Sequence, residues 1–239
     1  MTICILMLRN VRSPDFNNYW TESYKSIRKF YPDIDIKIID NNSTCASTIP
    51  LTNCEIIQAE YPESRLFSPY YEFLKMNGYS KAVIIHDGFI FNSYIDFNTV
   101  HNAKFMWHFE THDYDNHDLE TRQISLFDNN EPLLKMYNSK QWHGCLGCLL
   151  VIDKPFITML EDKYKISRLV TMIHNQEGAI AFERVIAVLC YYEHPDIVND
   201  LSFEGDIRNM IWGYRYSDYV QNPTVQQTKP FFKLFAGRK

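Results

Sequence analysis

The first ninety residues alternate short apolar segments with amphipathic helical patterns, and this alternation limits the possible folds more than any other feature. Segments such as Ile3–Leu8 and Ala82–Ile85 contain no charged residue, which is typical of strands buried on both faces of a parallel sheet. The pattern predicts an α/β fold with a mostly parallel sheet flanked by helices. The expected strands are 3–8, 34–39, 54–59, 82–85, 104–109 and 145–152, and the expected helices lie between Ser13 and Pro32 and at 69–76, 155–164 and 178–192.

Length, charge and hydropathy limit the number of domains, the binding partners and the location to be expected. The 239 residues contain no repeat or convincing linker, so we expect one domain, 1–239. The net charge of -5 argues against binding to nucleic acid, because no basic excess is present to neutralise phosphates. No apolar run approaches the roughly 18 residues of a membrane helix, so no transmembrane segment is expected. No signal peptide is recognised either, and the predicted location is cytoplasmic.

The six cysteines are interpreted as reduced thiols in the core of a cytosolic protein. Cys145 and Cys148 match the C-x-x-C spacing of zinc sites, but they have no second pair and lie inside an expected strand. We therefore interpret them as core residues.

Polar residues follow three of the expected strands: Arg9-Asn10, Asp40-Asn41 and His86-Asp87. In parallel α/β sheets ligands bind at the carboxyl ends of the strands, so three polar ends on one edge suggest a nucleotide site. Each end also has a simpler interpretation. Arg9 either contacts a nucleobase or pairs with Asp40, and Asp40-Asn41 either recognises a base or ribose or forms a turn.

Asp87 is the leading candidate metal ligand, because its carboxylate emerges at the ligand edge after an apolar strand. Mg²⁺ or Mn²⁺ bridging a diphosphate needs one or two such carboxylates. The alternative is an ordinary Asp-Gly turn, with His86 as a second ligand or a turn residue. The sequence lacks both G-x-x-x-x-G-K-[ST] and a G-x-G-x-x-G after the first strand, which favours a diphosphate held by metal.

The second half of the chain supplies the candidate catalytic residues. Glu177 begins an expected helix and is either a catalytic base or a partner of the helix dipole. Glu183 lies further along and is either a second candidate base or half of a charged pair with Arg184. Trp142-His143-Gly144 either packs against an acceptor sugar or belongs to the core.

Several of these segments resemble GT-A type glycosyltransferases, in particular small forms encoded by large DNA viruses. The similarity lies in Leu8-Arg9-Asn10, in Ile36–Asp40 and in Val83–Ile90, where the family carries its metal-binding Asp-x-Asp. It extends to Gly144–Ile152, to Ala181-Phe182-Glu183-Arg184 and to Lys233–Arg238. In this sequence Phe89 replaces the second carboxylate of Asp-x-Asp.

The resemblance implies a single GT-A (Rossmann-like) domain with a nucleotide-binding half, 1–92, and an acceptor-binding half, 93–239. It also implies a hexosyl- or pentosyltransferase that moves a sugar from a nucleotide-sugar donor, such as a UDP-sugar, to a glycan or protein hydroxyl. Arg9, Asn10, Asp40, Asn41, His86 and Asp87 would hold the donor, and Asp87 would bind Mn²⁺ or Mg²⁺. Glu177 would act as the catalytic base, with Glu183 as the fallback. Lys233 or Arg238 would stabilise the leaving group. The alternatives are an inactive GT-A-like binding or partner module, favoured by Phe89, and a nucleotidyltransferase.

Overall fold

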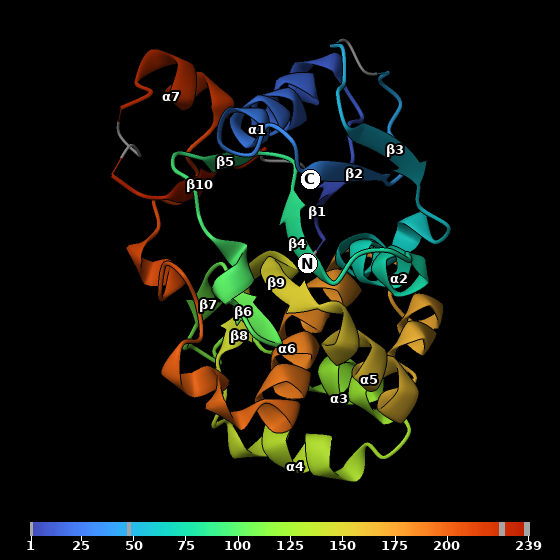
Figure 1. Cartoon of the computed structure of the whole chain (residues 1–239). Helices are drawn as coiled ribbons and strands as arrows, with labels where there is room; N and C mark the ends of the chain where they lie inside the picture. Colours follow the sequence, from blue (N-terminus) through green and yellow to red (C-terminus); the bar gives the residue numbers. More distant parts are fainter. Residues whose placement is uncertain (1, 47–48, 225–227, 237–239) are drawn as a thin grey trace.

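A six-stranded mixed sheet forms the centre of the molecule, as the computed structural model of residues 2–46, 49–224 and 228–236 shows (Figure 1). Its strand order is β3-β2-β1-β4-β9-β6. The strands β1 to β4 are parallel, whereas β9 runs antiparallel to both β4 and β6. The predicted α/β class with a mostly parallel sheet flanked by helices is confirmed.

The strands are β1 (Ile3–Arg9), β2 (Asp35–Asp40), β3 (Cys54–Gln58), β4 (Lys81–His86), β5 (Phe89–Phe91), β6 (Ala103–Phe105), β7 (His108–Phe109), β8 (Gly144–Cys145), β9 (Leu150–Asp153) and β10 (Phe231–Lys233). The helices are α1 (Asn17–Phe30), α2 (Ser68–Lys75), α3 (His117–Ser125), α4 (Glu131–Ser139), α5 (Lys154–Tyr164), α6 (Gln176–Glu193) and α7 (Tyr216–Gln221). Two small ribbons, β5 with β10 and β7 with β8, accompany the main sheet.

The two faces of the sheet have separate cores, because side chains alternate between faces along each strand. On one face Cys4 and Leu6 of β1 pack with residues of α2, α5 and α6. On the other face Ile5 and Met7 pack with α1, β5 and β10. Figure 1 shows α1, β5 and β10 at one end of the view and α3 to α6 at the other, with the sheet between them.

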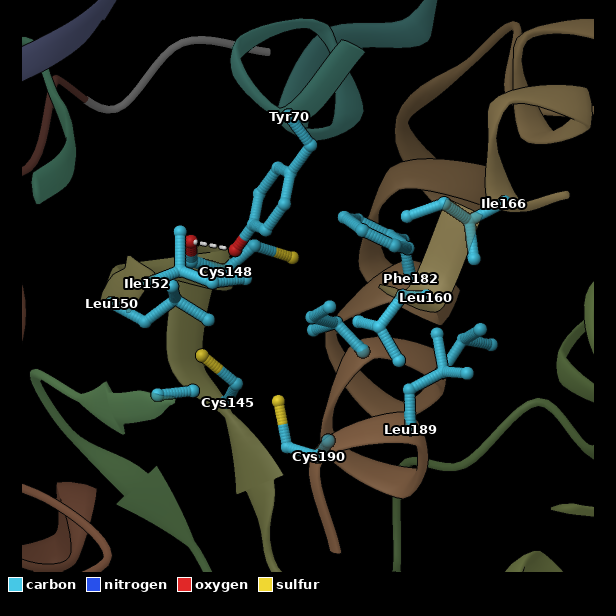
Figure 2. Packing of buried hydrophobic residues seen from close by; sticks show 14 of the residues in the cluster. Tyr70, Cys145, Cys148, Leu150, Ile152, Leu160, Ile166, Phe182, Leu189 and Cys190 are labelled. Carbon is cyan, nitrogen blue, oxygen red and sulfur yellow. Dashed lines mark hydrogen bonds between the residues drawn. The ribbon is translucent and has the colours of Figure 1, made fainter. Parts of the chain in front are cut away.

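The cysteines are all free, and Cys145, Cys148 and Cys190 are buried. Figure 2 shows these three side chains inside the core, where the Tyr70 hydroxyl donates a hydrogen bond to the Cys148 carbonyl, 2.6 Å. Burial raises the pKa of the Cys145 and Cys148 thiols well above the ordinary value. Protonated, enclosed thiols are poor metal ligands, so the C-x-x-C spacing reflects core packing, as expected.

Four local predictions differ from the structure. The first helix begins at Asn17, because Pro14–Phe16 forms a 3₁₀ turn. The expected strand 104–109 is divided into β6 and β7, and 145–152 is divided into β8 and β9 by a 3₁₀ turn at Leu146–Cys148. The helices α3 and α4 were not predicted. No helix in the described ranges combines the length and apolarity that a bilayer crossing requires.

Candidate functional site

The carboxyl ends of β1 and β4 meet at the point where the chain reverses its direction of winding. From β1 the chain builds outward through β2 and β3, then returns to place β4 on the other side of β1. In open α/β sheets this switch point is the crevice where ligands bind. Asn10 follows β1 and Asp87 follows β4, and the Asn10 amide donates to Asp87 Oδ2 at 3.4 Å. Asn10, His86 and Asp87 are all partly exposed.

Arg9 and Asp40 lie beneath this edge as a buried ion pair. Their side chains are 4% and 1% exposed, and Arg9 Nη1 lies 2.5 Å from Asp40 Oδ2. The guanidinium also donates to the Cys45 carbonyl and stacks over Trp20, 4.9 Å from the ring centroid. The structure therefore adopts the ion-pair alternative for Arg9. Because both side chains are buried and contact each other, neither reaches a ligand at the surface.

Asn41 is also buried and serves the same local framework. Its backbone N–H donates to the Arg9 backbone carbonyl at 2.8 Å. Its backbone carbonyl accepts a hydrogen bond from Asn10 Nδ2 at 2.8 Å. Asn41 therefore fixes the position of Asn10, which is the exposed member of the group. Of the predicted donor-binding residues, Asn10, His86 and Asp87 remain accessible, whereas Arg9, Asp40 and Asn41 support them from below.

The second half of the chain brings Glu183 to the same edge. Its Oε1 accepts a hydrogen bond from the Gly147 amide at 2.8 Å. Gly147 has a φ of +61°, and a Cβ there would lie 3.1 Å from His86 Cε1, so His86 packs directly against this turn. The turn that divides β8 from β9 thus connects the end of β4 with α6.

Burial raises the pKa of Glu183 above the ordinary value of 4.5. The positive charge of Arg184, the Gly147 amide and the charge of Lys233 act in the opposite direction. The side chain keeps 12% of its surface exposed, and Arg184 Nη1 contacts the other carboxylate oxygen at 2.9 Å. A largely buried carboxyl whose pKa is raised by burial is typical of groups that exchange protons during catalysis.

Glu177 and the basic residue Lys233, two of the other predicted catalytic groups, differ in their exposure and position. Glu177 is exposed in the first turn of α6. Lys233 lies in β10 opposite Phe89 of β5, is partly buried and is near enough to influence Glu183. It also lines a small pocket with Trp107, Met210 and Lys229. Arg238 lies outside the described residues.

Trp142 does not form a sugar-binding surface. It is fully buried, its ring stacks on Tyr137, and its Nε1 donates to the Tyr137 carbonyl at 3.0 Å. The structure thus adopts the core alternative for this residue.

His143, next to Trp142, belongs to a group that the sequence did not reveal. In the described part of the chain, one set of three potential metal-binding side chains has ligand atoms within 4.8 Å of one another: His108, Glu110 and His143. Burial and the neighbouring His143 lower the pKa of His108. The sequence feature that could have indicated this group is the i, i+2 spacing of His108 and Glu110 in an expected strand, which places both side chains on one face.

Comparisons with solved structures give likenesses at low sequence identity. The fold is similar to that of the galactosyltransferase LgtC in complex with donor and acceptor sugar analogues, with 11% identity, a TM-score of 0.44 and coverage of 95% of this chain and 80% of that one. An active-site mutant of LgtC also gives a TM-score of 0.44, with 9% identity over 75% of this chain and 69% of the other. No protein-family model and no curated protein matches the sequence.

Proposed function

We propose that this chain transfers a sugar from a nucleoside-diphosphate sugar to a hydroxyl acceptor at the β1/β4 edge. The observation that carries the proposal is the meeting of Asn10 and Asp87 at the topological switch point. Glu183 and Lys233, from the other half of the chain, lie around the same edge. The resemblance of these segments to GT-A glycosyltransferases supports the same interpretation.

The end of β4 offers one carboxylate, Asp87, so a metal ion there would need further ligands from the bound diphosphate. The candidate metal ligands are His86, the last residue of β4, and Asp87, which follows it. Phe89 is fully buried against Phe231. Such a set fits Mn²⁺ or Mg²⁺ that binds together with a diphosphate, because these ions accept one or two carboxylates plus phosphate oxygens and water. When bound, the ion supplies positive charge for the leaving diphosphate, and Lys233 provides a second positive charge nearby.

Glu183 is the proposed catalytic base. In an inverting transfer its carboxylate accepts the proton of the acceptor hydroxyl while that oxygen attacks the anomeric carbon and the bond to the diphosphate breaks. The Gly147 amide holds one carboxylate oxygen and Arg184 the other, so the group is fixed in orientation. We prefer Glu183 to Glu177 because Glu177 is exposed in the first turn of the helix.

A second candidate function is nucleotide-sugar or glycan binding without catalysis. The buried Phe89 favours it, because the position offers no second carboxylate for metal. The two functions differ in turnover: an active transferase slowly hydrolyses its donor in the absence of acceptor, whereas a binding module releases it unchanged.

Donor hydrolysis tests the proposal directly. The protein is incubated with Mn²⁺ and a panel of UDP- and GDP-sugars, and nucleoside diphosphate release is measured by chromatography. We expect release from at least one donor, a loss of about 10²-fold or more in Glu183→Gln, and little change in the matched variant Glu177→Gln. Binding of a donor without release in the wild type supports the binding module. Equal release by wild type and Glu183→Gln contradicts the assigned base.

A further inference from the structure

The β7/β8 ribbon places two histidines and a glutamate on one face. His108 pairs with Cys145 and Phe109 with Gly144, so continuing the register by one pair sets Glu110 opposite His143. His108 and Glu110 are two residues apart and point to the same side of an extended chain. Directly opposed residues in an antiparallel pair also share a face. The backbone therefore brings the three side chains together.

Neighbouring residues hydrogen-bond to this group, as the residues around the ligands of a metal site do. His108 Nε2 lies 3.8 Å from Glu110 Oε1, while His108 Nδ1 lies 2.8 Å from Ser202 Oγ. A hydroxyl partner on Nδ1 fixes the ring and leaves Nε2 directed at the glutamate, as outer partners do in metal sites. The second Glu110 oxygen is held by Arg208, and the Glu110 amide donates to Asp206 Oδ2 at 3.0 Å.

His143 provides an independent observation. Its Nδ1 atom is buried and has no hydrogen-bond partner among the described residues. A buried polar atom left without a partner costs about 1–3 kcal/mol, and its presence calls for an explanation. The ring stacks on that of His108 at an interplanar angle of 22°, with centroids 5.2 Å apart. A cation bound at Nδ1 would give this nitrogen its missing partner.

We propose that His108, Glu110 and His143 bind one divalent transition-metal ion of the zinc class. Two imidazoles and one carboxylate favour Zn²⁺ over Mg²⁺ or Ca²⁺, which prefer oxygen ligands. Three protein ligands leave a fourth position for water, and Glu110, 44% exposed, lies at the solvent side. The Arg208 guanidinium is neutralised by Asp206 at 2.6 Å and by Glu110 itself.

This site is separate from the β1/β4 edge and does not depend on the proposed function. Glu183 of α6 contacts Gly147 at the edge, whereas Tyr191, eight residues later in α6, lies beside His143. Eight residues of α-helix span about 12 Å. The site therefore lies about two helical turns from the proposed catalytic base.

The test is titration of the tag-free, metal-stripped protein with CoCl₂ and ZnCl₂, with Co²⁺ visible absorption and calorimetry as readouts. We expect one ion per chain and displacement of Co²⁺ by Zn²⁺. Loss of an outer partner typically weakens a metal site about 10–100-fold, so Ser202→Ala should fall in that range. His143→Ala and Glu110→Gln should weaken binding further.

Two controls make the outcome specific. His174→Ala removes an exposed histidine outside the group, and Asp87→Asn alters the β1/β4 edge. Both should keep wild-type Zn²⁺ affinity, so a failure of the glycosyltransferase proposal leaves this test intact. Circular dichroism checks that each variant folds. If His143→Ala does not fold, Glu110→Gln replaces it as the ligand variant, because Glu110 is exposed. Absence of Co²⁺ absorption in the wild type, or unchanged affinity in Glu110→Gln, would overturn the proposal.

Discussion

Arg9 and Asp40 have the most completely enclosed charges at the sheet edge. The Arg9 guanidinium contacts Asp40, the Cys45 carbonyl and the Trp20 ring, and Asp40 Oδ1 accepts from the Ser43 amide at 2.7 Å. From sequence, both residues were predicted at this edge. Their pairing could not be decided, because it depends on the packing of α1 and of the 43–45 turn.

Asp40→Asn should lower the free energy of unfolding by about 3–5 kcal/mol, because it leaves the Arg9 charge buried without a counter-ion. Glu55→Gln is the matched control, since it breaks an ion pair with Lys37 in which Glu55 is 61% exposed. That pair should contribute less than about 1 kcal/mol. Urea unfolding of the two variants measures the difference, and equal effects would contradict the buried-pair assignment.

Glu183 should set the acid limb of the pH–rate profile. A base must be deprotonated, and burial raises the pKa of this carboxyl above 4.5, so donor hydrolysis should increase with pH through a pKa above that value. Because the folded state holds the proton more tightly than the unfolded state, Glu183 ionisation reduces stability as pH rises through this range. Glu183→Gln should therefore lose activity and the acid limb without losing stability at pH 7. A limb that persists in this variant would exclude Glu183.

At the scale of elements, the buried parallel strands and the long helix α6 could be predicted, because their apolar patterns are continuous. The division of 145–152 could not, since a single glycine inside an apolar run fits a strand as well as it fits the turn at Gly147. That turn presents the Gly147 amide to Glu183. The helices α3 and α4 lie in a segment without strong periodicity, and they were missed for that reason.

The ribbon of β5 and β10 depends on Gly88. Its φ is +81°, and a Cβ there would lie 2.7 Å from the Leu234 carbonyl oxygen. Gly78 has a similar φ of +86° with nothing within 4 Å, so Gly78→Ala reports the backbone cost alone, about 1–2 kcal/mol. Gly88→Ala should cost more and expose the segment around β10 to limited proteolysis. The same loss of stability in both variants, with unchanged cleavage, would show that β10 is not held by this contact.

At the scale of the whole molecule, the candidate site is assembled from both halves of the chain. The first half supplies Asn10 and Asp87, while Glu183 and Lys233 come from α6 and β10. The sequence predicted the polar strand ends but favoured Glu177 over Glu183, because the choice depends on how α6 packs against the turn before β9. The His108, Glu110 and His143 group was missed for a similar reason, since it forms only when β7 and β8 pair.

Calorimetric titration with nucleoside diphosphates and nucleotide sugars in the presence of Mn²⁺ tests whether the β1/β4 edge binds a nucleotide sugar. The comparison is between wild type, Asp87→Asn and the control Asp33→Asn, which changes an exposed aspartate just before β2, at the opposite edge of the sheet. We expect binding of at least one UDP or GDP ligand that weakens at least about tenfold, or 1.4 kcal/mol, in Asp87→Asn only. Absence of binding across the panel, or equal affinity in all three proteins, would contradict a nucleotide-sugar site at the β1/β4 edge.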